Sequence, residues 1–135
     1  MKISALDWRN LSALYQDLAD ATLAYRIANS KSLTLDQKNS LNLHFGRLLN
    51  ASESFADEAL KQAMSDIDAS VEGIQTSVHD AVAAIHSVTA VKNVLDITVA
   101  AIGLSAAMLS PTPGTIATAL GGLVQALGQA QTVTG

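Results

Sequence analysis

Three histidines are the side chains in this sequence best suited to acid–base or metal chemistry: His44, His79 and His86. His79 and His86 are seven residues apart, so on one helix they share a face but lie two turns apart, too far to bind one zinc ion. A histidine can also sense pH near 6. Solvated or half-buried helical histidines are the simpler interpretation, and the sequence predicts no metal site.

The sequence motifs of the common catalytic classes are missing. There is no cysteine, no Gly-x-Ser-x-Gly nucleophile turn, and no Glu-x-x-His pair of the di-iron bundles. Gly121 and Gly122 are followed by no lysine, so they form no phosphate loop. The acidic residues Glu53, Asp57 and Glu58 indicate a solvated helix face. We therefore predict a non-enzymatic protein with no catalytic residues, no cofactor and no small-molecule substrate.

The charged residues are distributed very unevenly. All 8 basic and all 12 acidic residues lie between Lys2 and Asp96, and none lies between Ile97 and Gly135. The net charge of −4 gives no electrostatic attraction to a polyanion, so we predict no binding to nucleic acid. The chain is predicted to be a single domain, 1–135, in which 1–96 is charged and amphipathic and 97–135 is an uncharged hairpin of apolar and small residues.

Apolar residues at spacings of three and four predict an all-α fold, an antiparallel bundle of about four helices. The expected helices cover about 4–28, 34–64, 66–110 and 115–130. Thr34, with Gln37 three residues later, forms a capping-box pattern at the second helix. The break near Ser65 contains neither glycine nor proline, so a single helix from 35 to 110 is the alternative.

The third helix has the strongest periodicity, with a heptad pattern typical of coiled coils. Its stripe consists of Ile67, Val71, Ile74, Val78, Ala81, Ile85, Val88, Leu95, Val99, Ile102, Ala106 and Leu109. Lys92 interrupts this stripe and can pair with Asp96 one turn later. A polar residue in such a stripe can set the register of an assembly, which is one hypothesis for Lys92. Alternatively, its long stem covers apolar surface while its ammonium group reaches solvent.

The uncharged hairpin is the candidate functional region. Its first arm is apolar on all sides, so protein or lipid must cover it. Three covers are conceivable: the first two helices, a second copy of the chain, or a membrane. Each arm has about 14 uncharged residues, fewer than the roughly 20 that span a bilayer, which favours a shallow or inducible hairpin over a conventional transmembrane pair. The predicted association or membrane interface consists of Val99, Ile102, Ala106, Leu109, Ile116, Leu120, Leu123 and Leu127.

The sequence thus predicts a non-enzymatic helical-bundle protein that acts through protein–protein association, above all with itself or with another helical partner. The alternative is a membrane-active protein whose hairpin, 97–130, inserts into or lies on lipid. A long helix that leads into an uncharged hairpin is similar in layout to the α-helical pore-forming toxins, and this resemblance of architecture implies membrane action. Residues 1–9 contain no uninterrupted apolar stretch, so we expect no signal peptide and, by default, a cytoplasmic protein.

Overall fold

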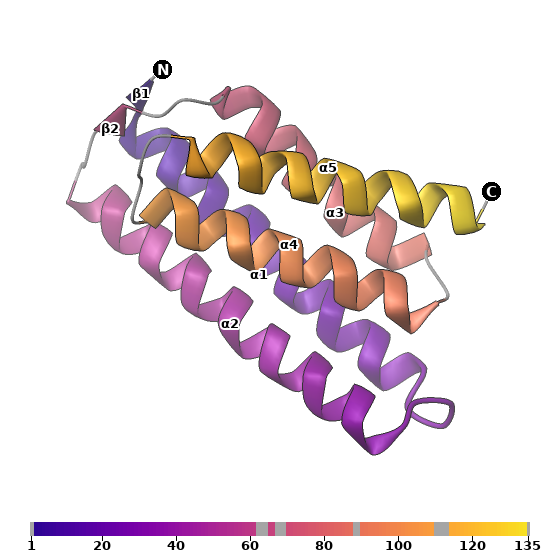
Figure 1. Cartoon of the computed structure of the whole chain (residues 1–135). Coiled ribbons are helices and arrows are strands. Elements are labelled where there is room, and N and C mark those ends of the chain that lie inside the picture. Colours follow the sequence, from indigo (N-terminus) through magenta and orange to yellow (C-terminus); the bar gives the residue numbers. More distant parts are fainter. Residues whose placement is uncertain (1, 62–64, 67–69, 88–89, 110–113, 135) are drawn as a thin grey trace.

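The computed structural model describes residues 2–61, 65–66, 70–87, 90–109 and 114–134, and these residues form an all-α fold (Figure 1). The helices are α1 (Ala5–Ala28), α2 (Leu35–Leu60), α3 (Val71–Ser87), α4 (Val91–Leu109) and α5 (Thr115–Thr134). Two short strands, β1 (Lys2–Ile3) and β2 (Ser65–Asp66), pair in antiparallel fashion. The all-α prediction is confirmed. The expected number of about four helices is corrected to five within the described residues, and the two-residue pairing of β1 and β2 was not predicted from the sequence.

Two capping boxes fix where the first two helices begin. The Ser4 hydroxyl accepts a hydrogen bond from the Asp7 amide, and the Asp7 carboxylate accepts one from the Ser4 amide. Thr34 and Gln37 exchange the same pair of bonds, at 3.1 and 2.9 Å, as the sequence predicts. Each box satisfies backbone N–H groups that have no partner within the helix, and so it stabilises one starting point over its neighbours.

The five helices are arranged as a closed ring of neighbours. In this ring α1 lies between α2 and α3, α5 lies between α3 and α4, and α4 packs on α2 (Figure 1). The chain folds as two hairpins, α1–α2 and α4–α5, with α3 placed between α1 and α5. The uncharged part of the sequence is therefore one side of the ring.

The middle of the bundle is filled by aromatic residues from α1 and α2. Trp8 and Tyr15 of α1 are both fully buried against Phe55 of α2. The ring centroids of Trp8 and Phe55 are 5.5 Å apart, and those of Tyr15 and Phe55 are 5.1 Å apart with an edge-to-face geometry. Such pairs add about 0.5–1.5 kcal/mol beyond their buried area, so this cluster anchors the α1–α2 hairpin.

The prediction of one long helix over 66–110 is wrong. Two helices occupy that span, and α4 runs in the opposite direction to α3 (Figure 1). The expected end of the second helix near 64 and the stripe positions Ile67 and Val88 lie outside the described residues. The alternative of a single helix from 35 to 110 is also wrong, because α2 ends at Leu60.

The reversal changes which side of α4 faces the core. In α3 the predicted stripe is buried, from Val71 to Ile85. In α4 the buried positions lie one residue earlier than predicted, and they are Asn93, Val94, Ile97, Thr98, Ala101, Leu104, Ser105 and Met108. A heptad pattern keeps the same side of a helix facing its partner only while the helix is continuous. Since α4 is a separate helix, the neighbours on which it packs determine which of its sides faces the core.

This register predicts opposite outcomes for two neighbouring truncations. Ile97→Ala removes a fully buried side chain and should lower the free energy of unfolding by about 2–5 kcal/mol. Val99→Ala removes a side chain that is 56% exposed and should change it by less than about 0.5 kcal/mol. Urea denaturation of both variants measures this difference, and a larger loss for Val99→Ala would show that the heptad register was right.

Candidate functional site

The outer side of the α4–α5 hairpin is the candidate functional site, and we call it the hairpin surface. It consists of the exposed or half-buried residues Val99, Ile102, Gly103, Ala106, Ala107, Thr118, Ala119, Gly121, Gly122 and Gln125. None of these side chains is charged. Apart from the Thr118 hydroxyl and the Gln125 amide, the side chains are apolar or a single hydrogen atom, so the surface forms few hydrogen bonds with water.

A shallow groove runs through this surface where the two helices meet. Small residues of α4 form one wall of the groove and small residues of α5 form the other. Gly114, just before α5, completes the lining. The lining residues are Gly103, Ala106, Ala107, Gly114, Thr115, Thr118 and Ala119. Walls built from such short side chains let the backbone of another helix approach closely, as happens at small-residue helix interfaces.

Three helical glycines of the hairpin surface have no packing role within the chain. A Cβ atom placed on Gly103, Gly121 or Gly122 would meet nothing within 4 Å. Glycine inside a helix costs about 1 kcal/mol relative to alanine. Because the space beside each glycine is open, packing within the monomer gives no reason for glycine in place of alanine at these positions. Gly46 in α2 is equally open, so glycine by itself does not define the surface.

The structure divides the predicted interface residues between the two sides of the hairpin. Val99 and Ala106 are exposed, Ile102 and Leu109 are half-buried, and all four belong to the outer side of α4. In α5, Ile116, Leu123 and Leu127 are buried in the monomer core and Leu120 is half-buried. Val99 and Ala106 are therefore available to a partner, whereas Ile102 and Leu109 also pack against the core and the α5 residues mostly hold the hairpin onto the bundle.

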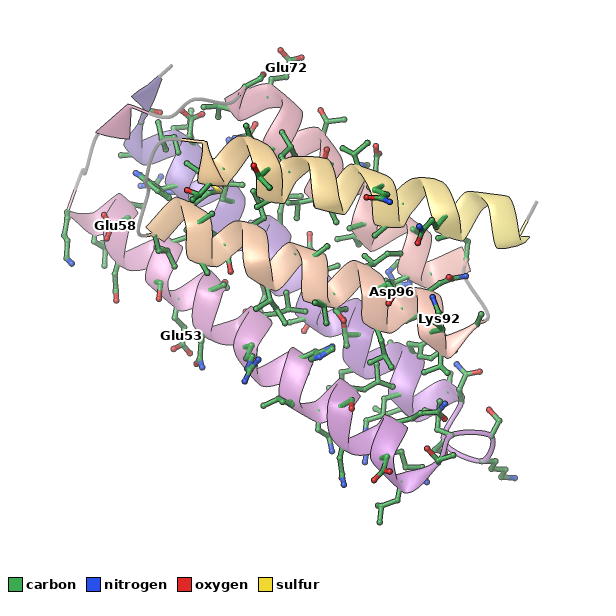
Figure 2. All side chains as sticks on the ribbon, in the orientation of Figure 1. Glu53, Glu58, Glu72, Lys92 and Asp96 are labelled. Atoms are coloured by element: carbon green, nitrogen blue, oxygen red, sulfur yellow. The ribbon has the colours of Figure 1, made fainter. Side chains whose placement is uncertain are left out.

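Lys92 is directed into solvent at the beginning of α4. Its Nζ lies 3.0 Å from Asp96 Oδ2, and the two side chains are 81% and 42% exposed (Figure 2). An exposed pair of this kind contributes only a few tenths of a kcal/mol. Within the monomer the lysine interrupts no buried stripe, so a role in setting the register of an assembly stays a prediction.

Two buried hydrogen bonds fasten the inner side of α4. Tyr15 donates its hydroxyl to the Ala101 carbonyl at 2.7 Å, and His44 Nδ1 lies 2.7 Å from Thr98 Oγ1. Burial lowers the pKa of His44, and the nearby Arg47 guanidinium lowers it further. Sequence reasoning treated His44 as a solvated or half-buried histidine. Its helical spacing from two apolar residues, three after Leu41 and four before Leu48, was the signal that could have placed it in the interior.

A second groove lies between α1 and α3. It is lined by Asn10, Ala13, Leu14, Gln75, Thr76 and His79. His79 is its one titratable group, and that side chain is 74% exposed beside Asp80. Among the residues that the structure describes, no three His, Asp or Glu side chains gather to hold a metal ion.

One helix among the described residues, α4, is long and apolar enough to cross a membrane by length and composition alone. It begins at Val91, so it is longer than the uncharged arm that the sequence suggested and includes Lys92 and Asp96. In this fold 44% of that segment is buried within the protein. A core helix of a soluble bundle has the same properties.

Comparisons of the chain with protein-family models, curated proteins and solved structures find no match.

The open space beside the helical glycines gives a direct prediction. Gly121→Ala and Gly122→Ala should each raise the free energy of unfolding of the monomer by up to about 1 kcal/mol, because alanine favours the helix and meets no neighbour.

Gly114→Ala is the matched control. Gly114 has φ of +83°, so a side chain there should lower the free energy of unfolding by about 1–2 kcal/mol. Thermal unfolding at low protein concentration measures all three variants. A loss of stability in Gly121→Ala or Gly122→Ala would show that those positions are already packed.

Proposed function

We propose that this protein is a non-enzymatic helical bundle that acts by associating with a second copy of itself through the hairpin surface. The observation that carries the proposal is the uncharged surface of α4 and α5 from residue 97 onward, where Val99 is 56% exposed and small residues line a groove between the two helices. The charged residues of α4, Lys92 and Asp96, lie before this surface, nearer the beginning of the helix.

The size of the hairpin surface supports only a weak dimer. The uncharged part of α4, residues 97–109, is about 20 Å long, and two helices about 10 Å apart give a face roughly 20 Å wide, so two copies would bury about 800 Å² in total. That area is below the roughly 1,000 Å² of most specific interfaces, so we expect association only at high protein concentration. Close approach of backbones in the groove would add contacts that this flat estimate leaves out.

The charge distribution also favours self-association at this surface. Each copy carries a net charge of −4, and all its charged residues lie outside the segment 97–135. Contact through any other side brings like charges together or removes ions from water, both of which cost free energy. Contact through the hairpin surface does neither, and it also fits a two-fold arrangement in which the same patch serves both copies.

A lysine placed on the hairpin surface should abolish this association. Sedimentation velocity at high protein concentration should show a dimer for the parent protein and a monomer for Val99→Lys and Ala106→Lys, because each variant would bury an unpaired charge between copies. Both residues are exposed in the monomer, so the melting temperature at low protein concentration should stay within a few degrees of the parent.

Leu43→Lys on α2 is the control for this experiment, since Leu43 is 53% exposed and lies outside the hairpin surface. It should sediment like the parent. A parent protein that stays monomeric up to the highest soluble concentration, or lysine variants that associate as well as the parent, would overturn the proposal.

The second candidate function is membrane action by the same hairpin. It is favoured by one observation, that α4 has the length and composition of a bilayer-spanning helix. In that case the parent protein should float with liposomes of neutral lipid, and Val99→Lys should float less, since a charge in the hydrocarbon region costs about 3 kcal/mol or more. A parent protein that dimerises and never floats would exclude this candidate.

A further inference from the structure

His44 is a titratable side chain of α2 that is only 9% exposed and contacts α4. Its Nδ1 lies 2.7 Å from Thr98 Oγ1, and that hydroxyl lies 3.1 Å from the Leu95 carbonyl. When the hydroxyl donates to Leu95, its oxygen accepts from the Nδ1 proton of the ring; when it donates to the ring, Nδ1 accepts. In either tautomer the neutral ring forms the bond to Thr98, and a second ring proton makes it a cation.

The charged groups around His44 offer it no compensation. Arg47, on the same helix, contributes a like charge. On α4 the nearest charged residues are Lys92 and Asp96, which pair with each other at 3.0 Å. On α1, Asp20 is exposed and accepts a hydrogen bond from Gln16. Within the described part of the chain, no carboxylate is paired with the His44 ring.

We propose that His44 is a pH-sensitive latch that holds the α4–α5 hairpin against the rest of the bundle. With a neutral ring, the hydrogen bond between His44 Nδ1 and Thr98 Oγ1 joins α2 to α4. A second proton on the ring places a positive charge with no paired carboxylate in this contact, and docking of the hairpin weakens. The inference rests on the proposed function in one respect, since it concerns the regulation of the same hairpin.

The direction of the pH dependence follows from proton binding. Burial and Arg47 lower the pKa of His44 in the folded protein, whereas the unfolded chain has the ordinary value of about 6.5. Below that pH the unfolded or undocked state binds more protons than the folded state. The stability that the neutral ring contributes is complete above about pH 6.5, decreases as the pH falls below it, and reaches a plateau below the folded pKa.

Two other polar contacts of the bundle do not respond in this pH range. The Tyr15 phenol keeps its proton in mild acid, because even the ordinary pKa of a phenol, about 10, lies far above this range, so its bond to the Ala101 carbonyl persists. The α1–α2 hairpin is held by reciprocal bonds in which Ser12 and Ser52 each donate a hydroxyl to the other's carbonyl, at 2.8 and 2.7 Å. Serine hydroxyls do not titrate. Mild acid should therefore loosen α4 and α5 and leave α1 and α2 in place.

Hydrogen exchange read by mass spectrometry, corrected for intrinsic rates, tests the latch between about pH 7.5 and pH 5. In the parent protein the opening constant of α4 and α5 should rise by up to about tenfold per pH unit below about pH 6.5, while that of α1 and α2 stays constant. His44→Asn keeps a neutral N–H donor and cannot titrate, so its α4 and α5 amides should show no such rise. His79→Gln and His86→Gln alter exposed histidines and should behave like the parent.

The same acid-induced opening in His44→Asn, or an equal rise over all helices of the parent, would overturn the latch. Because His44→Asn could weaken the fold, an NMR titration of the parent supplies an independent measurement. The His44 ring and the α4 amides should share one midpoint below about pH 6.5, and α4 amides that stay unchanged while the ring titrates would equally overturn it. A parent protein that is monomeric at neutral pH would sink the proposed self-association and leave both tests of the latch intact.

Discussion

The packing of α4 is the constraint on which the rest of the structure depends. Its inner side lies against α2 and α5, and it reaches α1 through the bond from the Tyr15 hydroxyl to the Ala101 carbonyl. Because α4 closes the ring of helices, its buried side chains share the interior with the aromatic residues Trp8, Tyr15 and Phe55. The exposed residues Val99, Gly103 and Ala106 lie on the other side of the same helix. Core and candidate site are thus two sides of one helix.

Much of the fold follows from local sequence signals. The polar caps at Ser4 and Thr34, together with apolar stripes at helical spacing, place α1 and α2 within a few residues of their observed bounds. The division between α3 and α4 had no such signal. Residues 86–91 contain neither glycine nor proline, and the heptad pattern continues across them, so periodicity favoured one long helix. Packing on α2 and α5, which no local pattern records, overrides that continuity.

The candidate site was predictable as a region but not as a surface. The absence of charge from Ile97 onward identifies the hairpin, because apolar and small residues alone cannot form a well-solvated exterior. Which residues face outward depends on the rotation of each helix: of the residues predicted for one interface, Val99 is exposed on α4, whereas Ile116, Leu123 and Leu127 of α5 are buried in the core. The contact between His44 and Thr98 joins positions 54 residues apart, and no sequence spacing could reveal it.

The one-residue shift in α4 has a consequence for how the helix is oriented. One residue corresponds to a rotation of about 100° about the helix axis, so α4 carries two adjacent apolar stripes that compete for the same place in the core. Ile102 and Leu109, on the outer stripe, are as large as the residues buried in their stead. Hydrophobic burial alone therefore discriminates poorly between the two rotations. The hydrogen bonds at Thr98 and Ala101 form in only one of these two rotations of α4, so they stabilise that rotation. They thereby determine which apolar stripe of α4 is exposed on the protein surface.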